Sequence, residues 1–171
     1  LGNHELDTTQ SDLLDSIEDF DGDILATNMN QEDVEAEDPK DVEELGRAPL
    51  AKSLKNSKVV EVKGEKIGLV GASPIDMFDR LTHPNYHTDC SIDALEDTIE
   101  DIQDEVDKMK EQGINKIFLL SHLGHQKDQI VAQNTKDIDV IIGGHTHELV
   151  KDIKEGENLF YNEDGEPVVL T

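Results

Sequence analysis

The stretch Ile138-Asp139-Val140-Ile141-Ile142-Gly143-Gly144-His145-Thr146-His147 joins a run of apolar strand-forming residues to two glycines and two histidines. Consecutive β-branched residues are typical of a strand buried on both faces, and glycines allow the backbone after it to turn sharply. We therefore expect both His145 and His147 to face inward. A second apolar run, residues 116–121, is followed by His122 and His125, so four of the seven histidines stand where predicted strands end.

Strand and helix patterns alternate along the rest of the chain. Residues 59–62 and 67–72, with a polar turn between them, predict a hairpin whose second strand is buried. Residues 92–112 carry apolar side chains three and four positions apart, with Ser91 as a candidate N-cap and Gly113 as a stop signal. This spacing also suits a coiled coil, but a single helix between two strands more often packs on a sheet.

The remaining segments give weaker patterns. Their spacing predicts helices at residues 10–20 and 126–134, a strand at 23–29, an acidic loop at 30–46, a loop with His83 and His87 at 74–90, and short β segments at 149–171. Strands that alternate with helices predict an α/β fold with mostly buried sheets.

The composition limits the classes of partner. The 171 residues fit one domain or most of one, and their net charge is −25. This charge argues against binding polymeric nucleic acid or anionic membranes, because both need clustered Lys and Arg. No apolar run approaches the roughly 20 residues of a membrane span, so membrane insertion is not expected. The single cysteine, Cys90, excludes an internal disulfide.

The histidines at the strand ends are candidate metal ligands. Ligands of α/β sheets bind outside the carboxyl ends of strands, and imidazole suits transition metals. Near the start, Gly2-Asn3-His4-Glu5-Leu6-Asp7 adds an amide oxygen, an imidazole and two carboxylates. An Asn carbonyl is a neutral metal ligand, and a carboxylate can orient and charge a neighbouring His. The sequence contains no phosphate-binding loop, zinc-protease, EF-hand or serine-hydrolase motif.

Gly2-Asn3-His4-Glu5, Ser121-His122-Leu123-Gly124-His125 and Gly143-Gly144-His145-Thr146-His147 together resemble the calcineurin-like metallophosphoesterase superfamily. Within it they resemble the 5′-nucleotidase branch, which includes UDP-sugar hydrolases and cyclic-nucleotide phosphodiesterases. The resemblance runs over essentially all 171 residues. It implies an α/β fold in which a β-sandwich is flanked by helices in four αββα layers, with residues 1–171 forming part of the catalytic domain.

The resemblance also implies a site for two divalent metal ions, of the kinds Mn, Zn, Fe, Co or Ca. Asn3, His122 and His145 would ligate one ion, and His147 would ligate the other. A metal-bound hydroxide would attack the phosphorus of a small phosphate ester in line. The implied reaction is hydrolysis of phosphate monoesters, above all 5′-nucleotides.

The catalytic side chains implied by the resemblance lie in the first motif. His4 would donate a proton to the leaving oxygen or stabilise the transition state, with Asp7 as its partner. Leu6 stands where Phe is commoner in the family, an apolar exchange that leaves the chemistry unchanged. His125 lies outside the family's ligand set and is interpreted as a neighbour of the ligands or a residue facing the substrate. Glu5 is interpreted as structural, and Cys90 as a small buried or loop thiol.

Several family features are missing from this sequence. They are the Asp-x-His strand and Gly-Asp turn, which supply a bridging Asp, and the C-terminal nucleotide-binding domain. We therefore expect this chain to be part of a longer protein, to bind one metal ion or none, and to have little activity alone. An unpaired strand edge would also favour its self-association.

Three interpretations of function remain open at this stage. The first is a nucleotide phosphomonoesterase; the second keeps the same dinuclear site in a cyclic-nucleotide phosphodiesterase or UDP-sugar pyrophosphatase. The third is a folded, non-catalytic structural or binding unit. Family analogy implies an extracellular, cell-surface or periplasmic location.

Overall fold

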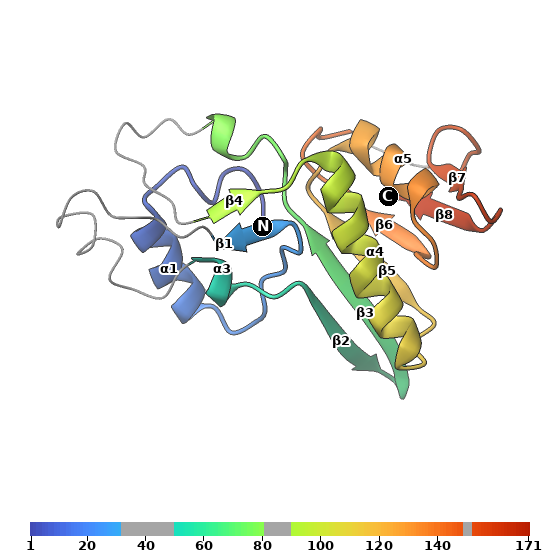
Figure 1. Cartoon of the computed structure of the whole chain (residues 1–171), viewed down its shortest axis with the longest axis horizontal. Helices are drawn as coiled ribbons and strands as arrows, with labels where there is room; N and C mark the ends of the chain where they lie inside the picture. Colours follow the sequence, from blue (N-terminus) through green and yellow to red (C-terminus); the bar gives the residue numbers. More distant parts are fainter. Residues whose placement is uncertain (32–49, 81–89, 149–151) are drawn as a thin grey trace.

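The computed structural model describes residues 1–31, 50–80, 90–148 and 152–171, and it is built on two sheets (Figure 1). In the larger sheet the strand order is β2-β3-β5-β6-β8-β7. Four inner strands run parallel, and an antiparallel strand closes each edge. The strands are β2 (Ser57–Val62), β3 (Glu65–Ala72), β5 (Ile117–Ser121), β6 (Val140–Ile142), β7 (Leu159–Tyr161) and β8 (Pro167–Leu170).

The predicted hairpin is confirmed as β2 and β3. Lys63 and Gly64, which join the strands, both have positive φ, of 54° and 84°. Two left-handed residues make the tight two-residue turn whose twist matches that of the flanking strands. The strands therefore continue to Val62 and resume at Glu65, so β3 begins two residues earlier than its apolar pattern indicates.

Two helices cover one face of the larger sheet: α4 (Leu95–Glu111) and α5 (His125–Asn134). Figure 1 shows α4 crossing in front of β3 and β5. The helix between two strands thus packs on a sheet, as its spacing favoured. Most of its acidic residues face solvent, whereas Glu105 is buried. The core between the helices and the sheet includes Val70, Ile102, Val106, Met109, Ile117, Leu119, Val131, Ile141 and Val168.

The opposite face of the larger sheet is more open. Leu120 of β5 and Ile142 of β6 are neighbours in the parallel register, and their exposed fractions are 38% and 42%. Both side chains point away from the face that α4 and α5 cover, because their strand neighbours Leu119 and Ile141 are buried in the core. The larger sheet therefore presents adjacent apolar side chains on its uncovered face.

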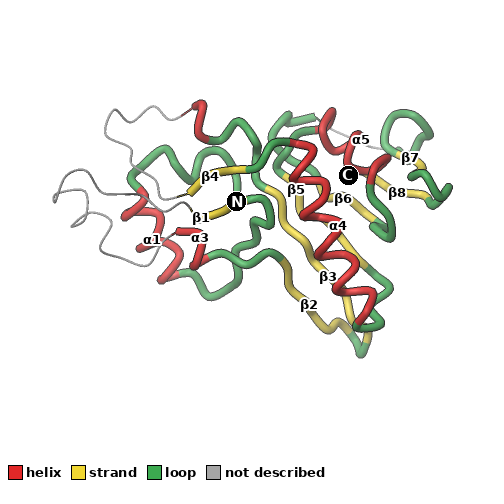
Figure 2. The backbone as a smooth tube through the Cα atoms, in the orientation of Figure 1, coloured by secondary structure: helices red, strands yellow, loops and turns green. Residues whose placement is uncertain are grey.

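A second, smaller core lies at the N-terminal side of the molecule (Figure 2). It is formed around α1 (Gln10–Asp19), α3 (Leu50–Ser53) and a two-stranded sheet of β1 (Met29–Gln31) and β4 (Cys90–Ile92). A capping box between Thr9 and Asp12 begins α1. The buried residues of this core are Leu6, Leu13, Leu14, Ala26, Met29, Leu50, Met77 and Cys90.

Asn28 links the segment that enters β1 to the end of β3. Its side-chain nitrogen donates to the carbonyl of Ser73 at 2.9 Å, and its side-chain oxygen accepts from the Ser73 N–H at 2.9 Å. Nearby, the Thr27 N–H donates to the Gly71 carbonyl at 2.7 Å. Asn28 and Ser73 are both fully buried. These bonds fix the position of the smaller core relative to the larger sheet.

Two local predictions are wrong. Residues 23–28 form no continuous strand: Leu25 makes one isolated bridge to Lys55, and the backbone bonds of the segment go to loops and to the end of β3. Ser91 is not the N-cap of α4, because it pairs with Asn30 in the two-stranded sheet. The helix instead begins after Ala94, which makes no side-chain cap bond.

The predicted fold class is confirmed, since the structure is a mixed α/β fold with a central sheet flanked by helices. The helix at residues 126–134 and the β segments near the C-terminus are also confirmed as α5, β7 and β8. Most of the acidic loop, together with His83 and His87, lies outside the described residues. Within the described residues, no helix combines the length and apolar character that crossing a bilayer requires.

Candidate metal centre

The carboxyl ends of the parallel strands bring two of the predicted ligands together. His122 follows β5 and His145 lies in the turn after β6. Asn3 reaches this point from the N-terminal segment. Its side-chain oxygen Oδ1 lies 3.0 Å from Nε2 of His122 and 3.0 Å from Nδ1 of His145. Three residues far apart in the sequence, all predicted as ligands of one metal ion, therefore direct donor atoms at a common point.

In the structure these two 3.0 Å contacts are hydrogen bonds to the Asn3 oxygen. The same spacing also suits two ligands bonded at right angles to one octahedral ion, each about 2.1 Å from it. Across the described part of the chain, no group of three or more His, Cys, Asp or Glu side chains is arranged to hold a metal. The candidate centre therefore depends on the Asn3 amide oxygen as the third donor.

The environment of His122 favours a neutral imidazole. Burial lowers the pKa of His122, and the nearby His145 ring lowers it further. The two ring centroids are 5.2 Å apart in an edge-to-face arrangement. Gly144 permits this packing, because a Cβ at that position would stand 3.0 Å from Nδ1 of His122. A neutral ring keeps the lone pair that a metal ligand needs.

The turn after β6 differs from its prediction. The left-handed residues are the histidines themselves, with φ of 75° at His145 and 56° at His147, whereas Gly143 and Gly144 do not have positive φ. Left-handed backbone is uncommon for a residue with a side chain and is often found at functional sites. His145 is partly buried, but His147 is exposed. The expectation that both rings face inward therefore holds for only one of them.

His147 lies beside a pocket of about 180 Å³ next to the candidate centre. The pocket is also lined by His125, whose Nε2 is hydrogen-bonded to Gln129 at 2.9 Å, and by Asp128. His145 borders the same pocket. The interpretation of His125 as a neighbour of the ligands is consistent with this position, and the assignment of His147 to a second metal ion stays a prediction.

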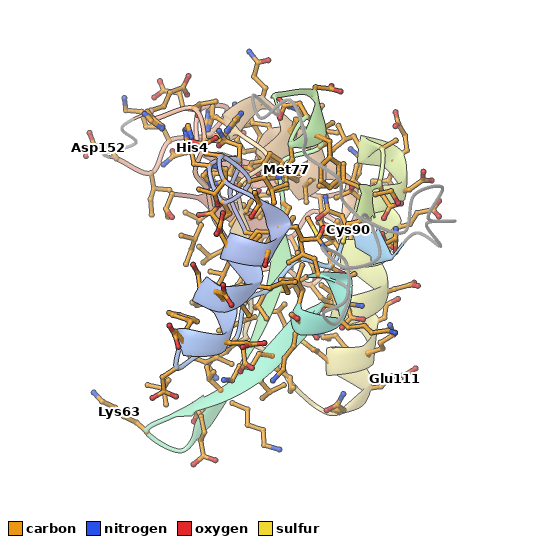
Figure 3. The ribbon with its side chains drawn as sticks, turned by 90° about the vertical axis from the view of Figure 1, so that its left-hand side faces the viewer. His4, Lys63, Met77, Cys90, Glu111 and Asp152 are labelled. Atoms are coloured by element: carbon orange, nitrogen blue, oxygen red, sulfur yellow. The ribbon has the colours of Figure 1, made fainter. Side chains whose placement is uncertain are left out.

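His4 and Asp7 form the pair expected from the first motif. Nδ1 of His4 lies 2.8 Å from Oδ2 of Asp7, and a backbone bond from the Asp7 N–H to the His4 carbonyl closes the turn. The two side chains are 75% and 57% exposed, whereas Leu6 between them is buried in the smaller core. Leu6 anchors the turn while both polar side chains stay accessible. Figure 3 shows His4 at the same end of the molecule as Met77, opposite Lys63 and Glu111.

The sequence interpretation missed two carboxylates near the predicted ligands. Asp76, in the turn after β3, has Oδ1 4.0 Å from Nε2 of His145. Asp128, on α5, is almost fully buried and accepts a hydrogen bond from Ser121 Oγ at 2.5 Å. Burial raises the pKa of Asp128 to about 6, although the bond from Ser121 opposes the shift. Only their positions in the sequence could have pointed to these two residues. Asp76 follows a buried strand, and Asp128 lies one helical turn after His125.

Glu5 and Cys90 have the structural roles expected of them. Glu5 accepts a hydrogen bond from the Gly2 N–H at 2.6 Å, which closes the turn that carries Asn3. Cys90 is buried in the smaller core.

A parallel sheet with histidines at its carboxyl ends and a facing Asn defines an α/β protein of the metallophosphatase type. A family model described as calcineurin-like phosphoesterase matches residues 1–149, and the chain belongs to this family. Members of the family are phosphoesterases, generally with two metal ions. The resemblance deduced from the three motifs is confirmed.

Named relatives are 5′-nucleotidases. The chain is 33% identical to a 5′-nucleotidase of Diplobatis ommata over 86% of its own length, and 32% identical to a probable 5′-nucleotidase of Treponema pallidum over 89%. It covers 23% of each of these relatives. The chain thus spans about a quarter of the curated relatives that it matches.

Solved structures agree with this result. A 5′-nucleotidase precursor from Thermus thermophilus superposes with a TM-score of 0.78 at 25% identity, over all of this chain and 32% of that one. The NAD nucleotidase of Haemophilus influenzae superposes with a TM-score of 0.76 at 30% identity, over all of this chain and 29% of that one. Both likenesses extend over every element described above.

Proposed function

We propose that residues 1–171 form part of the catalytic domain of a metal-dependent phosphomonoesterase that hydrolyses 5′-nucleotides. The observation that carries the proposal is the meeting of Asn3, His122 and His145, with Asn3 Oδ1 3.0 Å from each imidazole. The names of the relatives support a nucleotide as the substrate. The acidic surface does not oppose this, because bound divalent cations create a local positive site for a small phosphate ester.

In the proposed reaction, Asn3, His122 and His145 would hold one divalent ion and His147 would contribute to a second. Bound cations neutralise charge on the phosphoryl oxygens and activate water as a nucleophile. His4 donates a proton to the leaving oxygen of the nucleoside. Asp7, whose Oδ2 lies 2.8 Å from Nδ1 of His4, orients the His4 ring. The exposure of this pair leaves it accessible to a substrate.

The test uses the complete protein with AMP as substrate and a divalent metal added. Replacing His145 with Ala should abolish metal-dependent release of inorganic phosphate, because one of two imidazole donors is lost. Replacing the exposed Asp21 with Asn should leave the rate unchanged. Full activity of the His145→Ala variant would rule out the proposed site.

A second candidate substrate is a dinucleotide pyrophosphate. The likeness to the NAD nucleotidase of Haemophilus influenzae favours it, and the same ligand set could serve cleavage of a pyrophosphate bond. The two substrates are separated by comparing kcat/KM for AMP and for NAD on one preparation. A higher value for NAD would favour this second candidate.

A further inference from the structure

Asp128 is a buried carboxylate that the proposed reaction does not use. It lies in the first turn of α5, and its exposed fraction is 2%. Acidic side chains are almost never buried to this extent without a specific partner. The partner here is Ser121, whose Oγ donates to Asp128 Oδ1 at 2.5 Å.

Ser121 connects Asp128 to the loop that carries His122. Its Oγ also accepts a hydrogen bond from the N–H of Leu123 at 3.1 Å. An ionised carboxylate only accepts, so the single hydroxyl proton points at Asp128 and a lone pair of Oγ is left for Leu123. Ser121 and Leu123 are the two sequence neighbours of His122. The two bonds therefore fix the backbone on both sides of this predicted ligand.

The start of α5 closes the same loop. Gly124 is the N-cap of the helix, and its carbonyl accepts from the N–H of Asp128 at 3.0 Å. On the sheet side, the N–H of His122 donates to the carbonyl of Ala72, at the end of β3, at 2.9 Å. The loop is thus tied to a helix by Asp128 and to the sheet by Ala72. From this fixed backbone, Nε2 of His122 lies 3.0 Å from Asn3 Oδ1.

The other oxygen of Asp128 lies beside the turn that carries His145. A Cβ at Gly143 would stand 2.8 Å from Oδ2, so a larger residue there would displace the carboxylate. Gly143 directly follows β6 and is two residues before His145. One carboxylate therefore borders both turns that supply imidazole donors to the candidate centre.

We propose that Asp128 is a positioning residue that, through Ser121, holds the backbone at His122 where the ring can bind a metal ion. The proposal rests on the proposed function for the metal-binding role of His122, whereas the effect of Asp128 on the loop needs no metal ion. Asp128 acts through Ser121 and is not itself a ligand in this role.

The first test follows the loop without metal. Hydrogen exchange of the Leu123 amide is measured by mass spectrometry at neutral pH, in the complete protein stripped of metal by a chelator. Asp128→Ala and Ser121→Ala should each speed this exchange, because Oγ loses its orienting partner or is itself lost. Asp128→Asn should keep the slow exchange, since its amide oxygen can still accept from Ser121. Unchanged exchange in both alanine variants would overturn the proposal.

The second test measures the affinity of the complete protein for Zn²⁺ by calorimetry. Asp128→Ala and Ser121→Ala should each raise the Kd about tenfold, as expected for groups that hold metal ligands in place. The double variant should raise it no further, because all three variants lose the same chain of bonds. Asp128→Asn should bind as the wild type does. Additive effects of the two alanine substitutions would contradict a role of Asp128 through Ser121.

Thr135→Val is the matched control. Thr135 is as buried as Asp128 and lies at the opposite end of α5, where its hydroxyl donates to the Val131 carbonyl at 2.8 Å. Its loss should lower stability to urea but leave the affinity for Zn²⁺ unchanged. Wild-type affinity in Asp128→Ala, combined with loss of binding in His122→Ala, would refute the role of Asp128. If His122→Ala also binds normally, the proposed metal site is wrong, and the amide exchange alone decides whether Asp128 holds the loop.

Discussion

The side-chain oxygen of Asn3 lies 3.0 Å from Nε2 of His122, although 119 positions separate the two residues in the sequence. The contact joins a turn anchored in the smaller core to the end of an inner strand of the larger sheet. It is one of two contacts that bring the predicted ligands of one metal ion together.

Asn3→Ala should weaken metal binding without unfolding the chain. The substitution removes the third donor while both imidazoles stay in place, so we expect the Kd for Zn²⁺ to rise at least tenfold in the complete protein. Calorimetric titration measures it. Asn134→Ala is the control, because Asn134 is exposed near the end of α5. Equal affinity in wild type and Asn3→Ala would remove Asn3 from the site.

His4→Ala should lower kcat for AMP hydrolysis by about 10²–10⁴, the usual contribution of a general acid. Asp7→Asn should cause a smaller loss, because the ring remains but loses the charge that orients it. Neither change should alter the unfolding free energy by more than about 1 kcal/mol, since exposed pairs contribute little to stability. Steady-state kinetics and urea unfolding measure the two effects. A kcat that survives His4→Ala would reassign the acid.

Asp128 should make stability depend on pH. Its pKa is raised from 3.8 to about 6 in the folded chain, so the folded state binds this proton more tightly than the unfolded state. The resulting stabilisation is fully present below pH 3.8 and is lost as the pH rises through 6. At about 1.4 kcal/mol per pKa unit, the loss is about 2–3 kcal/mol.

Asp128→Asn cannot ionise, so it isolates this effect. The unfolding free energy of the wild type minus that of Asp128→Asn should fall by about 2–3 kcal/mol between pH 4 and pH 7. Urea unfolding at several pH values gives the difference. A flat profile for Asp128→Asn would show that burial does not raise the pKa of Asp128.

The sequence predicts self-association through an unpaired strand edge, and we predict that the uncovered face of the larger sheet contributes to it. Leu120 and Ile142 are adjacent there and are 38% and 42% exposed. Leu120→Ser should lower the apparent mass in light scattering at a given concentration, because it removes apolar contact area. Ile130→Ser is a matched control on α5, with 42% exposure. A monomeric wild-type chain would contradict the prediction.

Asn28→Ala should cost about 3 kcal/mol of unfolding free energy. It leaves the buried N–H and carbonyl of Ser73 without the partners that Asn28 supplies, and an unsatisfied buried polar group costs about 1–3 kcal/mol. Asn30→Ala is the control, because Asn30 is exposed and its side chain donates to Asp93 near the surface. Urea unfolding compares the two variants. A cost below about 1 kcal/mol for Asn28→Ala would mean that the link between the cores is weak.

The sequence predicted the larger sheet well because its strands are long apolar runs, as in residues 117–121, and because α4 has strict helical spacing. It failed at residues 23–28, whose backbone groups bond to Lys55, Gly71 and Asp93 rather than forming a ladder with a neighbouring strand. Apolar pattern alone cannot distinguish a strand from an extended segment packed at the end of a sheet.

The candidate metal centre was also predicted only in part from the sequence. The three motifs identified Asn3, His122 and His145, whose meeting is visible in the structure. Asp76 and Asp128 were missed because single carboxylates among 40 acidic residues carry no distinguishing pattern. Their significance depends on which side chains each one faces, and that is determined by the packing of the turn after β3 and of α5.

The bonds of Asn28 to Ser73 hold the smaller core against the larger sheet, so their loss on heating would let the two cores move apart. Asn3 belongs to a segment held by the smaller core through Leu1 and Leu6, while His122 and His145 follow strands of the larger sheet. A local opening between the two cores would separate the donor atoms without melting either core. Loss of the metal centre would then precede global unfolding, so residual secondary structure in a heated sample would overestimate the fraction of molecules that can still bind a metal.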